Sequence, residues 1–193
     1  GKSHPKDAET NPAPDKGGAY SWVKAPRYKN NPVEVGPLAR IAVNYFSNDE
    51  VVKTEVDNFL GRIGKKSNAL FSVMGRHAAR VIECKILCRE AKKWLKAIDV
   101  KSHTRQPFII PDNSEGFGMT EAPRGALGHW ITIKNQKIDR YQCVVPTTWN
   151  ASPKDNNGTP GPIEQALLNT PVSDIRNPIE AARVVRSFDP CLA

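Results

Sequence analysis

A carboxylate and a thiol flank a proline in Asp189-Pro190-Cys191. The proline stiffens the turn between the two side chains and so restricts the directions in which they point. A cysteine thiolate is a strong ligand for a soft or borderline transition metal. Three residues are weak evidence for a metal site by themselves, so their context has to decide whether Cys191 binds one.

Arg124 is a second candidate, because Pro123 fixes the backbone directly before it and Gly125 permits close approach or unusual dihedral angles directly after it. The guanidinium group would then be presented from a restrained turn and would hold an anionic or acceptor-rich ligand through several donors at once. A structural ion pair, for example with Glu121, explains the same pattern. The residues alone leave both interpretations open.

Three more candidates, His77, Cys84 and Cys88, recur at helical spacing and would share one face of a helix. A structural zinc site needs four protein donors, and a catalytic site needs three and a water. On an apolar helical face a buried cysteine behaves instead as a small hydrophobic residue. We therefore expect core packing, with His77 hydrogen-bonded in the interior or near its edge, and a metal site remains the alternative.

Two other histidines are ambiguous. His129 has a side chain able to carry a proton near neutral pH, and a packed histidine with one polar partner is the simpler expectation. His103 lies in a polar segment, so we expect it to be exposed.

Composition narrows the function classes. The chain has 193 residues, a net charge of +8 and four cysteines, too few for a disulfide-dense scaffold. Its basic residues are interspersed with acidic ones rather than clustered, which argues against a nucleic-acid partner. No apolar run approaches the roughly 20 residues of a membrane span. We expect a soluble, globular chain.

The secondary structure that would position these candidate residues begins with an irregular arm over residues 1–31 and a helical part over residues 32–105. Apolar spacing predicts helices over 34–45 and from about 50 to 63, the second preceded by cap-type residues and followed by Gly64. A long helix is predicted over 68–98. Its apolar stripe is expected to be buried, partly against segments outside this chain, and consists of Leu70, Met74, His77, Val81, Cys84, Cys88, Ala91 and Leu95.

The third part, residues 106–193, is predicted to contain a loop, a β-hairpin and short helices. Residues 107–118 are expected to form a loop, whereas the pattern over 126–146 predicts a β-hairpin around Lys134-Asn135-Gln136-Lys137. Prolines at first-turn positions predict helices over 163–168 and 179–187. The predicted fold class is mainly α with a small antiparallel hairpin or sheet.

Six ordered strings resemble the large subunit of nickel–iron hydrogenases, and the first and third resemble its uptake-type branch. They are SWVKAPRY (21–28), NPVEVGPLAR (31–40), GMTEAPRGALGHW (118–130), YQCVVPTTWNASP (141–153), GPIEQAL (161–167) and RSFDPCLA (186–193). The resemblance implies the α-rich large-subunit fold, of which residues 1–193 would be the C-terminal portion.

The resemblance also implies a bimetallic site. Cys191 corresponds to a terminal nickel ligand, Arg124 to an arginine over the open metal position, and Asp189 to an acid beside it. A fixed cation and a carboxylate in a dry pocket would polarise hydrogen during heterolytic cleavage.

The resemblance assigns further ligand contacts. The iron would carry cyanide and carbon monoxide, and the backbone around Pro123 and Arg124, with the Thr147 hydroxyl, would hydrogen-bond the cyanides, which are costly to bury unpaired. Cys143 would offer a backbone carbonyl to a magnesium ion.

The implied activity is reversible oxidation of H2 to protons and electrons, with electrons leaving through iron–sulfur clusters of a small subunit. The implied location is periplasmic or membrane-associated through partner subunits, with a cytoplasmic location still open.

Departures from the family pattern limit what this chain does alone. It holds no Arg-x-Cys-Gly-x-Cys pair and stops at Ala193, one residue before the expected bridging cysteine. Three of the four thiolates are therefore expected in the missing remainder of the large subunit, and the chain alone should be inactive. Two alternatives remain: a quinone-binding relative from complex I, against which Asp-Pro-Cys and EAPRG argue, and a truncated, non-catalytic binding subunit.

Overall fold

The structure is a computed structural model that describes residues 4–9, 11 and 13–191. Within that part the fold is mainly α with one small antiparallel sheet, as predicted. The helices are α1 (Pro37–Phe46), α2 (Glu50–Arg62), the 3-10 helix η1 (Ser67–Leu70), α3 (Val73–Ala97), α4 (Pro146–Asn150), α5 (Pro162–Leu167) and α6 (Ile179–Ser187). The strands are β1 (Asn113–Ala122), β2 (Gly125–Lys134) and β3 (Lys137–Val144).

The first helical layer is held together by an apolar core between α1, α2 and α3. The side chain of Asp49 caps α2 by accepting a hydrogen bond from the Val52 amide at 2.9 Å. Gly64, with φ of 62°, follows the end of α2, so both predicted boundaries are confirmed. The buried core residues are Leu38, Ile41, Val52, Val56, Leu60, Leu70, Ala79 and Ile82.

The apolar stripe predicted to be buried is mostly exposed within this chain, although Leu70 at its start is buried as predicted, and packing of the stripe on segments outside this chain stays a prediction. Met74, Val81 and Leu95 are 73%, 69% and 70% exposed, and His77, Cys84 and Cys88 are exposed too. The buried positions are instead Gly75, Ala79 and Ile82. Small residues allow close approach, and a Cβ at Gly75 would overlap the Leu70 carbonyl. Apolar spacing marked one face of α3, and packing uses another.

The sheet has the strand order β1-β2-β3, with both pairs antiparallel. Asn135 and Gln136 join β2 to β3 with φ of 50° and 61°, the left-handed pair that a two-residue hairpin turn requires. The predicted hairpin is confirmed.

The loop predicted over 107–118 is wrong from residue 113 onward, because β1 begins there and pairs with β2 along its whole length. Gly116 and Gly118 weaken the local strand signal, so β1 depends on its partner strand rather than on its own residues. Residues 98–112 do lack helix and strand, and His103 is exposed as expected.

The remaining helices follow the predictions closely. Helix α5 begins at Pro162, and α6 has the predicted bounds. Helix α4 was missed, because five residues are too few to show a periodic pattern. The described residues of the 1–31 arm contain turns and one isolated bridge, Tyr28 to Asn31, which confirms an irregular arm.

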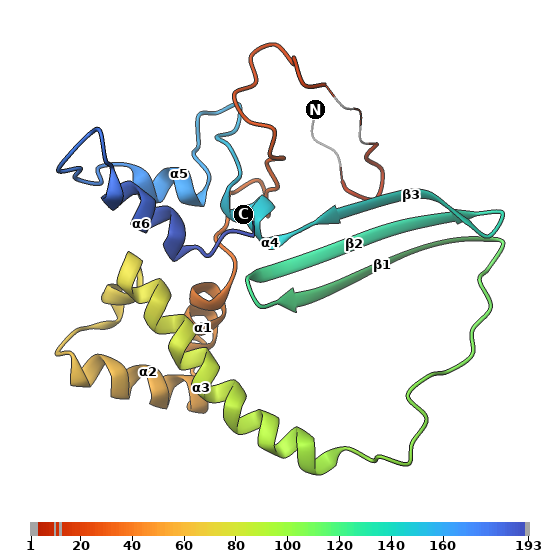
Figure 1. Ribbon diagram of the computed structural model, residues 1–193, viewed down its shortest axis with the longest axis horizontal. Helices are drawn as coiled ribbons and strands as arrows, with labels where there is room; N and C mark the ends of the chain where they lie inside the picture. Colours follow the sequence, from red (N-terminus) through yellow and green to blue (C-terminus); the bar gives the residue numbers. More distant parts are fainter. Residues whose placement is uncertain (1–3, 10, 12, 192–193) are drawn as a thin grey trace.

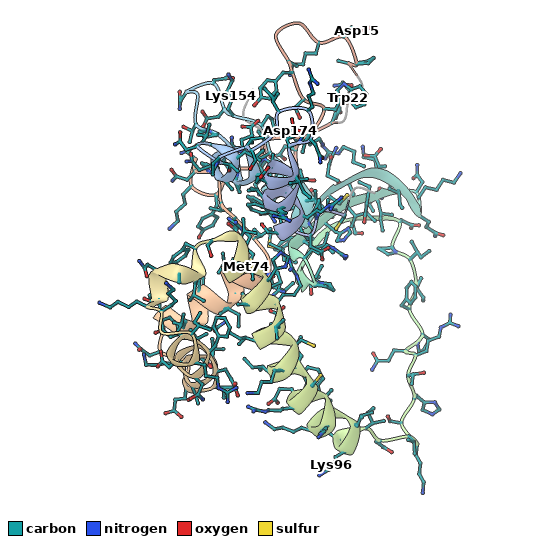
Figure 2. All side chains as sticks on the ribbon, turned by 60° about the vertical axis from the view of Figure 1, so that its left-hand side comes forward. Asp15, Trp22, Met74, Lys96, Lys154 and Asp174 are labelled. Carbon is teal, nitrogen blue, oxygen red and sulfur yellow. The ribbon has the colours of Figure 1, made fainter. Side chains whose placement is uncertain are left out.

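The three parts meet at the centre of the molecule. Figure 1 shows α1–α3 on one side, α5 and α6 on another, and the sheet projecting away, with α4 and the C-terminal end of the chain at the junction. In Figure 2, Lys96 lies at the far end of α3, from which the exposed 98–112 segment runs back toward the sheet. None of the helices described has the length and apolarity of a membrane span.

Candidate metal-binding site

Arg124 and Asp189 lie together, although 65 positions separate them in the sequence. Arg124 Nε is 2.9 Å from Asp189 Oδ2, and each side chain is just over two-fifths exposed. Among the described residues no aligned hydrogen-bond acceptor faces that buried nitrogen, so the contact is an ion pair rather than a directed hydrogen bond. The suggested pairing of Arg124 with Glu121 is wrong, because the Glu121 carboxylate accepts from Arg40 Nη1 at 2.6 Å.

The turn that carries Arg124 is as restrained as its sequence predicted. Ala122 pairs with Gly125, so Pro123 and Arg124 alone connect β1 to β2. Gly125 has φ of 134°, and a Cβ there would lie 2.6 Å from Val35 Cγ2. Gly36 faces the same turn, where a Cβ would lie 2.8 Å from the Arg124 carbonyl oxygen. Both glycines therefore permit close backbone approach.

A second contact joins Cys191 to α4. The Cys191 amide donates to Thr147 Oγ1 at 2.9 Å, and Thr147 is 5% exposed. The hydroxyl oxygen is the acceptor in this bond, so the bond does not use the hydroxyl hydrogen. The Cys191 side chain is exposed. The chain reaches it through Asp189, which has φ of 52° and donates its amide to the Arg186 carbonyl at 3.0 Å.

The structure therefore brings five of the predicted site residues into one place. Pro123 and Arg124 form one turn, the Arg124 ion pair joins this turn to the segment of Asp189 and Cys191, and Thr147 contacts Cys191. Cys143 lies at the end of β3, with its side chain exposed and opposite His129 in the strand register. Nothing in the geometry assigns a role to the Cys143 thiol.

Several residues that hold this site had no predicted role. Arg76 binds the Glu34 carboxylate through two 2.8 Å hydrogen bonds, and its guanidinium carbon lies 3.8 Å from the centroid of the Phe188 ring. Arg80 Nη2 donates to the Ser187 carbonyl at 2.9 Å. These arginines fix the residues just before Asp189. Apart from Glu34, which lies in the NPVEVGPLAR string, the sequence carried no signal for them.

The other candidates lie away from this site. A hydrogen bond with Cys88 raises the pKa of the Cys84 thiol, and both cysteines lie on the exposed face of α3. His129 Nδ1 bonds the Tyr141 hydroxyl, the single polar partner that was expected. A cavity of about 330 Å³ lies over the sheet, lined in part by Phe117 and Trp130, and contains no predicted site residue.

A family model for nickel-dependent hydrogenases matches residues 1–193. The chain belongs to the nickel-dependent hydrogenase family. It is 48% identical to the periplasmic NiFeSe hydrogenase large subunit of Desulfomicrobium baculatum, an alignment that covers 100% of this chain and 38% of that protein. It is also 48% identical to the uptake hydrogenase large subunit of Bradyrhizobium diazoefficiens, with 93% and 32% covered.

Solved structures of the family agree. The H2-activated NiFeSe hydrogenase of Dm. baculatum superposes with a TM-score of 0.89 at 49% identity, and covers 100% of this chain and 40% of that one. The chain thus spans about a third to two fifths of the length of these relatives. Its fold is part of the hydrogenase large-subunit fold, and its relatives include both periplasmic and uptake enzymes.

The donor set fits one part of a nickel site. Cys191 offers a soft sulfur donor, and the buried Arg124 Nε, with no aligned acceptor, and the Thr147 hydroxyl offer hydrogen-bond donors around it. No group of three or more His, Cys, Asp or Glu residues that could hold a metal occurs in the described part of the chain. A nickel centre here would need additional ligands from outside these residues.

Proposed function

We propose that this chain forms part of the nickel–iron active-site subunit of a hydrogenase that oxidises H2 reversibly and heterolytically to protons and electrons. The observation that carries the proposal is the convergence of the Arg124–Asp189 ion pair with the Thr147–Cys191 contact. Family membership makes nickel the relevant metal.

Each residue has a separate task in this proposal. Cys191 binds nickel through its thiolate, and the metal centre, when bound, supplies the redox chemistry and the Lewis acidity that H2 cleavage requires. Arg124 would hold a fixed positive charge beside the bound metal, and Asp189, in its ion pair with Arg124, would orient that guanidinium and add a carboxylate that helps to polarise hydrogen. Such preorganised charges stabilise the charge separation of heterolysis most effectively where water is excluded.

The finer ligand set belongs to the same proposal. The iron carries cyanide and carbon monoxide, and the backbone near Pro123 and Arg124, with the Thr147 hydroxyl, donates hydrogen bonds to the cyanides. The bond that Thr147 Oγ1 accepts from the Cys191 amide leaves the hydroxyl hydrogen unused. The Cys143 backbone carbonyl is a candidate ligand for magnesium.

The partners are part of the same proposal. The remainder of the large subunit supplies the other thiolates, and a small subunit with iron–sulfur clusters receives the electrons. Residues 1–31, 32–105 and 106–193 then serve as arm, helical support and active-site part of a C-terminal portion. We place the assembled enzyme in the periplasm or at the membrane through its partners, in line with the periplasmic relative.

A matched pair of cysteine variants tests the proposal in the matured heterodimer that contains the complete large subunit. Cys191→Ala should remove nickel and hydrogen-dependent dye reduction, because it deletes a metal ligand. Cys143→Ala should keep both, because only its backbone carbonyl is assigned a role. Normal nickel content and activity in Cys191→Ala, or none in the unaltered protein after full maturation, would overturn the proposal.

A further inference from the structure

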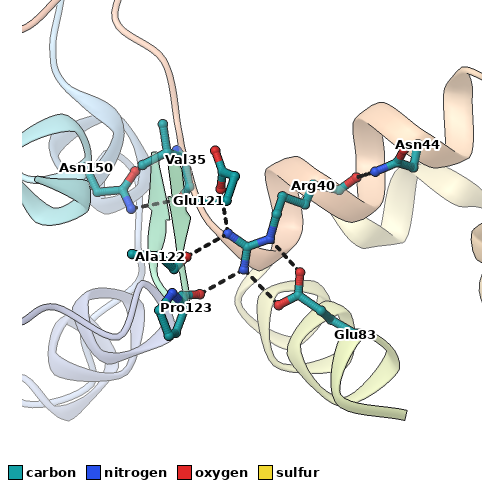
Figure 3. A network of polar contacts seen from close by, with 8 residues as sticks. All are labelled: Val35, Arg40, Asn44, Glu83, Glu121, Ala122, Pro123 and Asn150. Atoms are coloured by element: carbon teal, nitrogen blue, oxygen red, sulfur yellow. Dashed lines mark hydrogen bonds and ion pairs between the residues drawn. The ribbon is translucent and has the colours of Figure 1, made fainter. Parts of the chain in front are cut away.

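One segment, residues 34–40, contacts the Arg124 turn and α4 directly and reaches the residue before Asp189 through Arg76. Figure 3 shows the central contact, in which the Arg40 guanidinium lies between α3 and the end of β1. We propose that Arg40 is a positioning residue that holds the Arg124 turn in register with the rest of the site. This inference rests on the proposed function for its catalytic consequence and on geometry alone for its structural one.

The guanidinium of Arg40 uses all three of its nitrogens. Nε and Nη2 donate to the two carboxylate oxygens of Glu83 on α3, at 2.5 and 2.8 Å. Nη1 donates to Glu121 at 2.6 Å and to the Ala122 carbonyl at 3.1 Å, and Nη2 also donates to the Pro123 carbonyl at 2.8 Å. The planar fork of arginine suits this set of acceptors, which a single ammonium group cannot reach together.

These acceptors matter because of their position in the chain. The carbonyls of Ala122 and Pro123 belong to the two residues directly before Arg124. Strand pairing closes the hairpin but does not fix the hairpin against the helices. Arg40 supplies that link, because it projects from α1 and its two hydrogen bonds to Glu83 end on α3. The hydrogen bonds with Glu83 raise the pKa of Arg40, which keeps it cationic.

The same segment reaches the other site residues. The Val35 amide and carbonyl each form a 2.9 Å hydrogen bond with the side-chain amide of Asn150, on the helix that carries Thr147. Glu34 binds Arg76, which stacks on Phe188 next to Asp189. Contacts of Glu34, Val35 and Arg40 therefore connect the Arg124 turn, α4 and, through Arg76, the segment before Asp189 to one short stretch of the chain.

An ordinary structural ion pair would also stabilise the chain, so the experiment has to separate stability from positioning. Arg40→Lys keeps the charge and removes the fork. Arg89→Lys is the matched control, because Arg89 also projects from a helix and pairs with a carboxylate, that of Glu55 at 2.5 Å, away from the site. Both variants are prepared in the complete large subunit within the heterodimer.

The readouts are hydrogen–deuterium exchange over residues 119–128, nickel content, and kcat and KM for hydrogen-dependent dye reduction. Arg40→Lys should speed exchange in 119–128 by about tenfold, because hydrogen bonds to two carbonyls are lost. It should also lower kcat several-fold while KM and nickel content stay within twofold. Arg89→Lys should leave all four quantities unchanged.

Equal exchange and equal kcat in Arg40→Lys and Arg89→Lys would overturn the inference. Faster exchange without any hydrogenase activity in the unaltered protein would uphold the positioning role and defeat the proposed function. If Arg40→Lys fails to fold, Glu83→Gln provides the test, since it loosens the anchor of Arg40 on α3 and leaves the contacts of Arg40 with the turn. It should raise exchange in 119–128 by a smaller factor, and an unchanged rate would overturn the inference.

Discussion

The two faces of α3 differ in composition and in burial. Its outer stripe, made of Met74, His77, Val81, Cys84, Cys88 and Leu95, has the apolar spacing of a buried helix and is exposed. Its inner face combines the small buried residues Gly75 and Ala79 with Ile82 and the polar residues Arg76, Arg80 and Glu83. Close packing and charged hydrogen bonds, rather than apolar spacing, decide which face this chain covers.

The inner face also connects packing to the site. Arg76 and Arg80 hold the backbone before Asp189, and Glu83 holds Arg40 against the Arg124 turn. These three residues follow one another at intervals of four and three, so they lie along one side of the helix. Helix α3 thus supports both halves of the site.

The largest expected effect is on the free energy of unfolding, and it distinguishes two neighbouring residues that lie on opposite faces of α3. Ile82→Ala should lower the free energy of unfolding by about 2–5 kcal/mol, because it leaves a cavity in the core of α1–α3. Val81→Ala, one residue away on the outer stripe, should change it by less than about 0.5 kcal/mol. Denaturant unfolding of the chain measures both. Equal losses would mean that both faces are covered and that the contrast is wrong.

The next largest effect on stability is expected from the polar residues of the inner face. Arg76→Met keeps the aliphatic stem but removes two hydrogen bonds to Glu34, and it should cost about 1.5–3 kcal/mol, as expected for hydrogen bonds to a charged group. The pair is largely buried, with Arg76 12% exposed, so the loss should change little with salt. Met74→Ala on the outer stripe, where the side chain is 73% exposed, serves as the control. A strong salt dependence of the Arg76→Met effect would place this pair at the surface.

A smaller effect is expected on the pH dependence of stability, through the ion pairs that join Glu55 of α2 to Lys85 and Arg89 of α3. Hydrogen bonds from Lys85, and then from Arg89, lower the pKa of Glu55. The folded state therefore favours the ionised carboxylate, and its stabilisation is present above the ordinary pKa of 4.5 and is lost as the pH falls through the lower folded value. Glu55→Gln should flatten the stability profile in that acidic range. A profile that keeps its full slope would assign the acid sensitivity to other carboxylates.

The smallest effect is expected for the two cysteines of the outer stripe, and it tests whether that stripe is exposed. Cys84→Ser and Cys88→Ser should leave the unfolding midpoint unchanged, because both side chains are exposed. Both thiols should react with a disulfide reagent in the folded chain. The raised pKa of Cys84 reduces its thiolate fraction at neutral pH, so Cys84 should react more slowly than it does in Cys88→Ser. Protection of both thiols until denaturation would contradict the exposed stripe.

Local signals predicted much of the fold. The cap at Asp49, the Asn135-Gln136 turn and the proline that opens α5 each follow from neighbouring residues. Strand β1 and the buried face of α3 did not follow, because partners distant in the sequence determine both. Periodicity identifies an apolar face, and only the tertiary structure tells which face is used.

In the candidate site, too, some features could be predicted from neighbouring residues and others could not. The restrained turn at Arg124 could be derived from Pro123 and Gly125, whereas the roles of Cys191 and Thr147 came from the family resemblance. The ion pair with Asp189 and the anchoring by Arg40 required the structure, since no sequence spacing relates these residues. Binding of nickel by Cys191 stays a prediction.

Anomalous diffraction at the nickel edge from crystals of the matured heterodimer tests the central claim most directly. The account predicts a nickel peak within bonding distance of the Cys191 sulfur, about 2.3 Å as for comparable metal–thiolate bonds, with the Arg124–Asp189 pair beside it. A nickel peak remote from Cys191, or an Arg124 side chain turned away from the metal, would contradict the account.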